Sequence, residues 1–150
     1  MTKKEKAIEL FEQGYNCAQA VAGAFSEEMG MDTLQVVKAV SGFGGGIGRL
    51  REVCGAVSGM VFVANVLYGY ESPTDMDAKK AHYREIQSLA KAFSETNGSY
   101  ICRELLGLTI DGADSPVPEK RTTAYYQKRP CVELVGDAAE ILEKFIAEHK

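Results

Sequence analysis

Apolar residues recur at helical spacing along most of this 150-residue chain. Sustained two-residue alternation in Val-, Ile- or Thr-rich runs is missing, so the pattern predicts helices rather than strands. Helices of this kind bury one apolar stripe each in a shared core. Glycines and prolines punctuate the helices and do not separate domains. We therefore predict one all-α domain over residues 1–150, a compact bundle of about five to seven helices.

Capping and breaking residues set the expected boundaries. Asn16 is the expected cap of the second helix, and Ser99 that of a short helix that holds Cys102. The stretch 107–120 contains glycines and prolines and is predicted to be irregular. The expected helices cover about 3–13, 17–29, 33–40, 49–68, 75–96, the few residues after 99, and 131–148.

The formal net charge of -4 and the pI near 5.3 exclude a general nucleic-acid binder, which would carry a strong basic excess. Lys120, Arg121, Lys128 and Arg129 form a small basic spot. We interpret this spot as solvated surface.

The stretch Val53 to Tyr70 is mostly apolar but carries Asn65 and several glycines. It falls short of the ~20 residues that span a bilayer, so we expect a buried core helix and no membrane insertion. The N-terminus lacks the apolar run of a signal peptide, which favours a cytoplasmic location.

Four cysteines carry the chemistry that we expect: Cys17, Cys54, Cys102 and Cys131. Each lies where a helix is predicted to begin, and the amides and dipole of a helix start favour the thiolate. In a reducing cytoplasm four thiols are not expected to form permanent disulfides. Metal binding, redox chemistry and inert burial remain.

Successive cysteines are separated by roughly 30 to 50 residues, so no two of them form a C-x-x-C pair. Short connections make successive bundle helices antiparallel, which places the four predicted helix starts at one end of the bundle. Gly55 and Gly59 on one helix, and Ala18 and Ala22 on another, would let two of these helices approach closely. His82 and His149 are expected to lie away from this end.

The run Ser41–Arg49 is rich in glycine but fits neither a dinucleotide-binding nor a P-loop pattern. Its flexible backbone could form an anion-binding nest beside Cys54, with Gly45 and Gly46 donating hydrogen bonds to thiolates or cluster sulfurs. Arg49 and Arg51 would add positive potential. The alternative is a tight connection between close-packed helices.

The segment Cys54-Gly55-Ala56-Val57-Ser58-Gly59, together with Asn16-Cys17-Ala18 and the two later lone cysteines, resembles the C_GCAxxG_C_C family. The family name writes the first two letters of the central motif in the opposite order. The resemblance spans the region from Cys17 to Cys131. It implies a redox-active protein in which Cys17, Cys54, Cys102 and Cys131 are the functional residues, with Gly55 and Gly59 as supporting structure.

Four hypotheses follow, and the first three differ in what the sulfurs do. The first is an electron-transfer protein that binds an iron–sulfur cluster through the four thiolates. The second is a thiol–disulfide protein with Cys54 as attacking thiolate and Cys17 as its pair. The third is a structural Cys₄ zinc site, and the fourth a small-molecule- or partner-binding bundle with inert cysteines. The electron or thiol partner is unknown, a homo-oligomer is compatible with the sequence, and whether the protein is an oxidoreductase stays open.

Overall fold

The computed structural model describes residues 1–110 and 112–149, and of residues 126–128 the backbone alone. Among these residues it contains ten α-helices and one 3₁₀ turn, so the all-α prediction is confirmed and the helix count exceeds the expected range. The added elements are short, and a helix of four to six residues is too brief to show periodicity. The elements are α1 (Lys3–Glu12), α2 (Cys17–Gly23), α3 (Ser26–Met29), α4 (Thr33–Ala39), η1 (Ser41–Phe43), α5 (Gly44–Ile47), α6 (Gly55–Tyr68), α7 (Met76–Asn97), α8 (Cys102–Leu105), α9 (Thr123–Lys128) and α10 (Cys131–Glu148).

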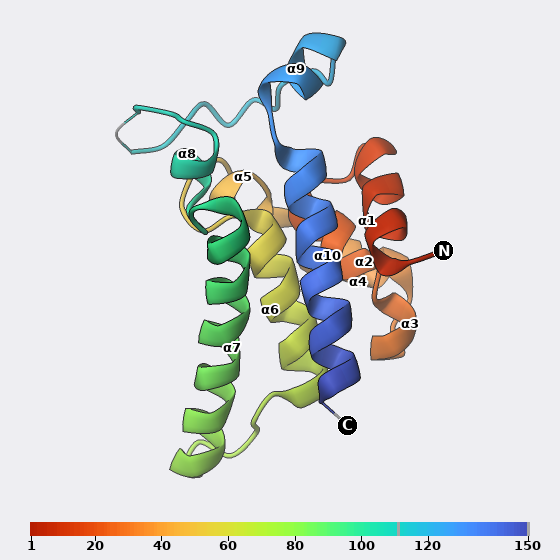
Figure 1. The fold of residues 1–150 in the computed structure, drawn as a ribbon, viewed down its shortest axis with the longest axis vertical. Coiled ribbons are helices and arrows are strands. Elements are labelled where there is room, and N and C mark those ends of the chain that lie inside the picture. The colour runs from red at the N-terminus through yellow and green to blue at the C-terminus, as the bar shows by residue number, and fades with distance from the viewer. Residues whose placement is uncertain (111, 150) are drawn as a thin grey trace.

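Helix α2 lies at the centre and packs against α1, α4, α6 and α10, while α7 packs against α6 and α10. The core between these helices contains fully buried aromatic and aliphatic side chains. Figure 1 shows α5, α8 and the first turns of α6 and α10 gathered at the end of the bundle where α7 stops. The largest core side chains are Phe11, Phe25, Phe93, Met60 and Leu142.

Helix α6 begins at Gly55, and the prediction of a start near Arg49 is wrong. Residues 51–54 are drawn out of the helix by backbone pairing with the chain around Cys102. Val53 forms an antiparallel bridge with Ile101, the Cys54 amide donates to Tyr100 O (2.8 Å), and the Cys102 amide donates to Glu52 O (2.6 Å). This pairing sets Cys54 and Cys102 beside each other.

Two other boundaries also differ from expectation. The second helix ends at Gly23, because Phe25 leaves helical geometry (φ -108°, ψ 16°) and a separate helix, α3, follows. Helix α8 begins at Cys102 with Ile101 as its cap residue, while the Ser99 hydroxyl accepts a hydrogen bond from the Ile101 amide. Helix α9 was not expected from the sequence.

Among the described residues, no helix combines the length and the apolar character needed to cross a bilayer. The expected apolar core segment is α6, in which Met60, Val63 and Ala64 are buried. Its Asn65 bonds the His82 ring at 2.7 Å.

Candidate functional site

All four cysteines line one cavity of about 290 Å³ at the end of the bundle shown at the top of Figure 1. They come from the starts of four separate helices, α2, α6, α8 and α10. Cys54, Cys102 and Cys131 are buried, Cys17 is partly buried, and all four are free thiols. Neither His82 nor His149 lines the cavity.

Close packing of α2 on α6 brings Cys17 near Gly55, the residue that follows Cys54. A Cβ added to Gly55 would lie 3.2 Å from the Ala18 amide nitrogen and 3.3 Å from Cys17 Cβ. A Cβ on Gly59 would lie 2.9 Å from Ala18 O. The small residues therefore allow the close approach that their spacing predicts.

Helix α2 begins with a reciprocal cap. The Asn16 side chain accepts from the Gln19 amide, and the Gln19 side chain accepts from the Asn16 amide. Asn16 Nδ2 also donates to Ser41 O (3.0 Å). This bond joins the start of α2 to the run Ser41–Arg49, which we call the glycine-rich turn. The cap fixes Cys17 in the first turn, as expected from the sequence.

The glycine-rich turn follows a left-handed path. Gly45, Gly46, Ile47, Gly48 and Arg49 all have positive φ, between 53° and 69°. Ile47 is β-branched and pays a steric cost in this conformation. A left-handed run of this length at the wall of a cavity is a strained backbone of the kind that gathers at functional sites.

Gly46 backs directly onto Cys102. A Cβ at Gly46 would lie 2.7 Å from Cys102 Cβ and 2.7 Å from the Glu52 amide nitrogen. Gly45 and Gly46 both line the cavity, as expected. The amides that reach a sulfur are those of Ala56 and Val57, which donate to Cys54; sulfur bonds from Gly45 and Gly46 stay a prediction.

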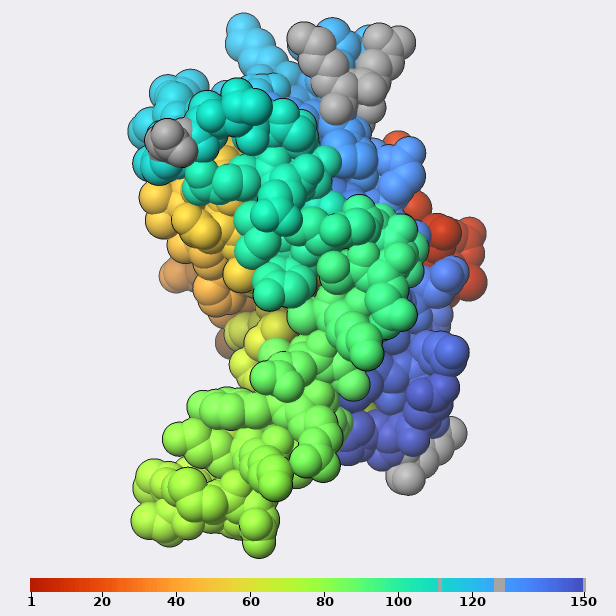
Figure 2. Space-filling model, turned by 60° about the vertical axis from the view of Figure 1, so that its left-hand side comes forward, coloured from red at the N-terminus to blue at the C-terminus, as the bar shows by residue number. Residues whose placement is uncertain are grey.

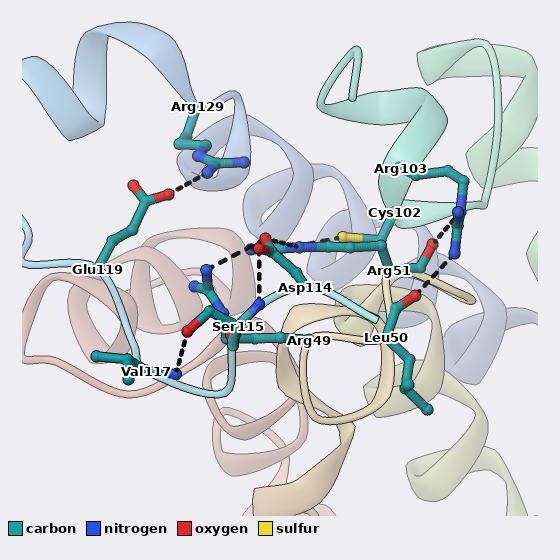
Figure 3. A network of polar contacts seen from close by, with 10 residues as sticks. All are labelled: Arg49, Leu50, Arg51, Cys102, Arg103, Asp114, Ser115, Val117, Glu119 and Arg129. Atoms are coloured by element: carbon teal, nitrogen blue, oxygen red, sulfur yellow. Dashed lines mark hydrogen bonds and ion pairs between the residues drawn. The ribbon is translucent and has the colours of Figure 1, made fainter. Parts of the chain in front are cut away.

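Arg51 connects a carboxylate to a cysteine. Its guanidinium is buried, donates to Asp114 Oδ2 through Nε (3.2 Å) and Nη2 (3.0 Å), and reaches Cys102 Sγ through Nη1 (3.6 Å). Arg49 Nη2 donates to the same Asp114 oxygen (3.2 Å) (Figure 3). The Ser115 amide, which donates to Asp114 Oδ1 (2.8 Å), and then these two arginines hold the pKa of Asp114 below its usual value. The result is a cationic edge beside the Cys102 sulfur.

Arg103 holds the extended segment that pairs with α8. Its guanidinium donates to the carbonyl oxygens of Leu50 (2.8 Å), Arg51 (3.2 Å) and Ile110 (2.8 Å), and forms an ion pair with Glu52 (3.3 Å). Figure 3 shows Arg103 on the far side of Cys102 from Asp114. One side chain therefore fixes the backbone that leads into Cys54.

The basic spot expected to be solvated surface is partly a wall of the cavity. Arg121 and Arg129 both line it, whereas Lys120 is exposed and the Lys128 side chain lies outside the described residues. Arg121 donates to the carbonyl oxygens of Phe11 and Tyr15 and lies 3.9 Å from the Phe11 ring centroid. These tertiary contacts draw two of the four cations inward, and no local sequence pattern reveals them.

The four thiols do not share the acidity that their helix starts predict. A hydrogen bond from Cys17 lowers the pKa of Cys131 to about 7, and Tyr125, Arg129 and Arg121 act in the same direction. The same bond, with burial, raises the pKa of Cys17. Burial raises the pKa of Cys54 to about 12 in spite of the two amides that donate to its sulfur.

Burial also raises the pKa of Cys102, although Arg51 opposes that effect. The prediction of four acidic thiols is therefore wrong for Cys17, Cys54 and Cys102, because removal from water outweighs the helix start. Cys131 is therefore the cysteine whose pKa its surroundings lower. The Tyr125 hydroxyl donates to the Cys131 sulfur.

Within the described part of the chain, no three His, Cys, Asp or Glu side chains are arranged to hold a metal ion. A tetrahedral zinc site needs Zn–S distances near ~2.3 Å, which forces its sulfurs almost into contact. The zinc site therefore stays a prediction, as does the iron–sulfur cluster.

Comparison with known proteins agrees with this site. A sequence model of the family described as "Putative redox-active protein (C_GCAxxG_C_C)" matches residues 15–145, a span that includes all four cysteines. A protein from Archaeoglobus fulgidus, named "Uncharacterized protein", is 26% identical over 155 aligned residues, covering 98% of this chain and 95% of that protein. No solved structure matches. The chain therefore belongs to the C_GCAxxG_C_C family.

Proposed function

We propose that the protein transfers electrons through an iron–sulfur cluster held by the thiolates of Cys17, Cys54, Cys102 and Cys131. The observation that carries the proposal is the convergence of four lone cysteines, from four helices, on one cavity of about 290 Å³. Four cysteine thiolates are the standard ligands of such clusters. A bound cluster would supply one-electron transfer, with an external protein or small molecule as the unknown partner.

The wall of the cavity suits an anionic group. Arg49, Arg51, Arg121 and Arg129 line it, while Glu119 is the carboxylate among the lining residues and Asp114 lies behind two of the arginines. Guanidinium groups near a cluster stabilise its negative charge and raise its reduction potential. The glycine wall lets backbone approach where a Cβ would intrude on Cys102.

Iron and acid-labile sulfide analysis of protein purified without oxygen tests the proposal. We expect both elements in similar amounts and a paramagnetic signal after chemical reduction. Cys54→Ser should lose iron and sulfide. Val57→Ala, which truncates a buried side chain one turn away, is the matched control and should retain them at some cost in stability. Colourless protein free of iron and sulfide would refute the proposal.

A second candidate is thiol–disulfide exchange, favoured by the hydrogen bond between Cys17 and Cys131. We propose Cys131 as the attacking thiolate, in place of Cys54, because its pKa is the lowered one. Cys131 sulfur would attack a partner disulfide and release one partner thiolate. Cys17 sulfur would then displace the second, leaving a Cys17–Cys131 disulfide and a partner reduced by two electrons.

Mild oxidation followed by peptide mapping distinguishes the pairs. A Cys17–Cys131 disulfide is expected, and Cys131→Ser should prevent it. A disulfide between Cys17 and Cys54 would restore the pairing first predicted from the sequence. Four thiols that stay reduced would exclude this candidate. A cytoplasmic location, where thiols are kept reduced, remains part of both proposals.

A further inference from the structure

Residues 112–122, which we call the strap, form part of the cavity wall without any helix or strand of their own. Pro116, Pro118, Glu119 and Arg121 of the strap line the cavity. In Figure 2 the teal and light-blue residues that follow Cys102 lie over the orange glycine-rich region and cover this end of the molecule. The strap therefore forms one side of the cavity that the cysteines line.

Polar contacts hold the strap at its two ends. At one end, Asp114 accepts from Arg49 and Arg51, the Asp114 amide donates to Arg49 O (3.0 Å), and Arg49 Nε donates to Ser115 O. At the other, Glu119 pairs with Arg129, and Arg121 donates to the carbonyl oxygens of Phe11 and Tyr15. Between these ends Val117 is 68% exposed and adds nothing to the core.

Such a segment opens at a low free-energy cost. Partly exposed ion pairs contribute little each, and a segment with no helix or strand of its own opens locally before the core does. Asp114 attaches the first part of the strap, because two arginines on the cavity wall share its carboxylate. Cys54 and Cys102, at 4% and 7% exposure, are closed off while it is attached.

From this geometry we infer that the strap is a charge-latched lid over the four-cysteine cavity, with the Arg49–Asp114–Arg51 contact as its latch. Opening the latch admits the cofactor or the thiol partner. The inference rests on the proposed function in taking the cysteines as the reactive groups. It adds a step that ionic strength controls, the entry of the cofactor or the thiol partner into the cavity.

Labelling of Cys54 and Cys102 in the reduced full-length protein tests the lid. N-ethylmaleimide and a polyethylene-glycol maleimide serve as small and bulky probes, with each cysteine followed by mass spectrometry. Asp114→Asn should speed labelling of both residues roughly five- to tenfold, more for the bulky probe. High salt should speed it in the wild type and leave Asp114→Asn unchanged.

Glu28→Gln is the matched control, since Glu28 forms an ion pair with Lys3 (2.7 Å) at similar exposure on another part of the fold. Its labelling rates should equal those of the wild type. Equal rates in all three proteins with no salt effect would overturn the lid, and so would equal acceleration by both substitutions. If Asp114→Asn does not fold, the wild-type salt series decides. Absence of iron and sulfide would defeat the cluster without changing these rates.

Discussion

Cys131 and Cys54 both lie at the start of a bundle helix, yet the pKa of Cys131 is lowered and that of Cys54 is raised. The helix start is a local property that the sequence displays. Burial and the approach of Tyr125, Arg121 and Arg129 depend on segments far along the chain. The positions of the cysteines were therefore predictable, whereas the identity of the acidic one was not.

Alkylation of Cys131 by iodoacetamide in the cofactor-free protein should rise with pH and reach half its maximum near pH 7, because the thiolate is the nucleophile. Cys54 should stay unreactive across that range. Tyr125→Phe removes a donor to the thiolate and should move the Cys131 midpoint up by roughly one pH unit. The measurement is peptide-resolved mass spectrometry.

Tyr100→Phe is the control for that series, because Tyr100 is 43% exposed and does not line the cavity. Its Cys131 midpoint should match the wild type. A midpoint near that of an ordinary thiol, or one that Tyr125→Phe leaves in place, would contradict the assignment of Cys131.

Gly46→Ala should lower the free energy of unfolding by roughly 2–4 kcal/mol, since its Cβ would meet Cys102 Cβ and the backbone of Arg51 and Glu52 at positive φ. Gly48→Ala shares the positive φ but meets nothing within 4 Å, so it should cost about 1 kcal/mol. Urea unfolding measures both. Equal losses would show that backbone strain alone, and not contact with Cys102, requires glycine at 46.

At the scale of elements, the long helices followed from periodicity and caps, and the short ones did not. Helices α1, α4, α7 and α10 lie within about a residue of their predicted bounds, because caps and glycines act locally. The late start of α6 depends on pairing with residues near Cys102. The sequence of residues 49–54 by itself does not reveal that they pair with the residues near Cys102.

Asn16→Ala should cost about 1–2 kcal/mol of unfolding free energy, because it removes a reciprocal cap and the bond to Ser41 O. Thr2→Ala removes a reciprocal cap of the same kind on α1 without a tertiary bond, so it should cost about 0.5–1 kcal/mol. Thermal unfolding measures the difference. A larger loss for Thr2→Ala would show that Asn16 does not join α2 to the glycine-rich turn.

For the whole molecule, alternation of helix direction was enough to predict that the four cysteines meet. The cavity wall was less predictable, since the strap and Arg121 reach it through contacts between residues that are distant in sequence. The side chains that stabilise the fold and those that surround the cysteines also lie in different parts of the bundle. The apolar core extends through the bundle, while the polar network lies at the cysteine end.

Leu142→Ala, a truncation at a fully buried position of α10, should lower stability by roughly 2–5 kcal/mol. The residue lies about three turns from Cys131 on the same helix, so the pH midpoint for Cys131 alkylation should not move while the protein is folded. Urea unfolding and alkylation on the same preparation check both parts. A shifted midpoint would indicate that core packing sets the acidity of the site.

The cysteines that meet at the cavity also join distant parts of the chain. A disulfide between Cys17 and Cys131, or a cluster bridging them, closes a loop of about 110 residues, and loops of that size correspond to about 4–5 kcal/mol of lost unfolded-state entropy. Under either proposal, the loaded or oxidised protein is cross-linked across about three quarters of its length. Reduction or cofactor loss would release that cross-link and lower the free energy of unfolding. The rate at which the protein unfolds and is degraded would then depend on the redox state of the cell.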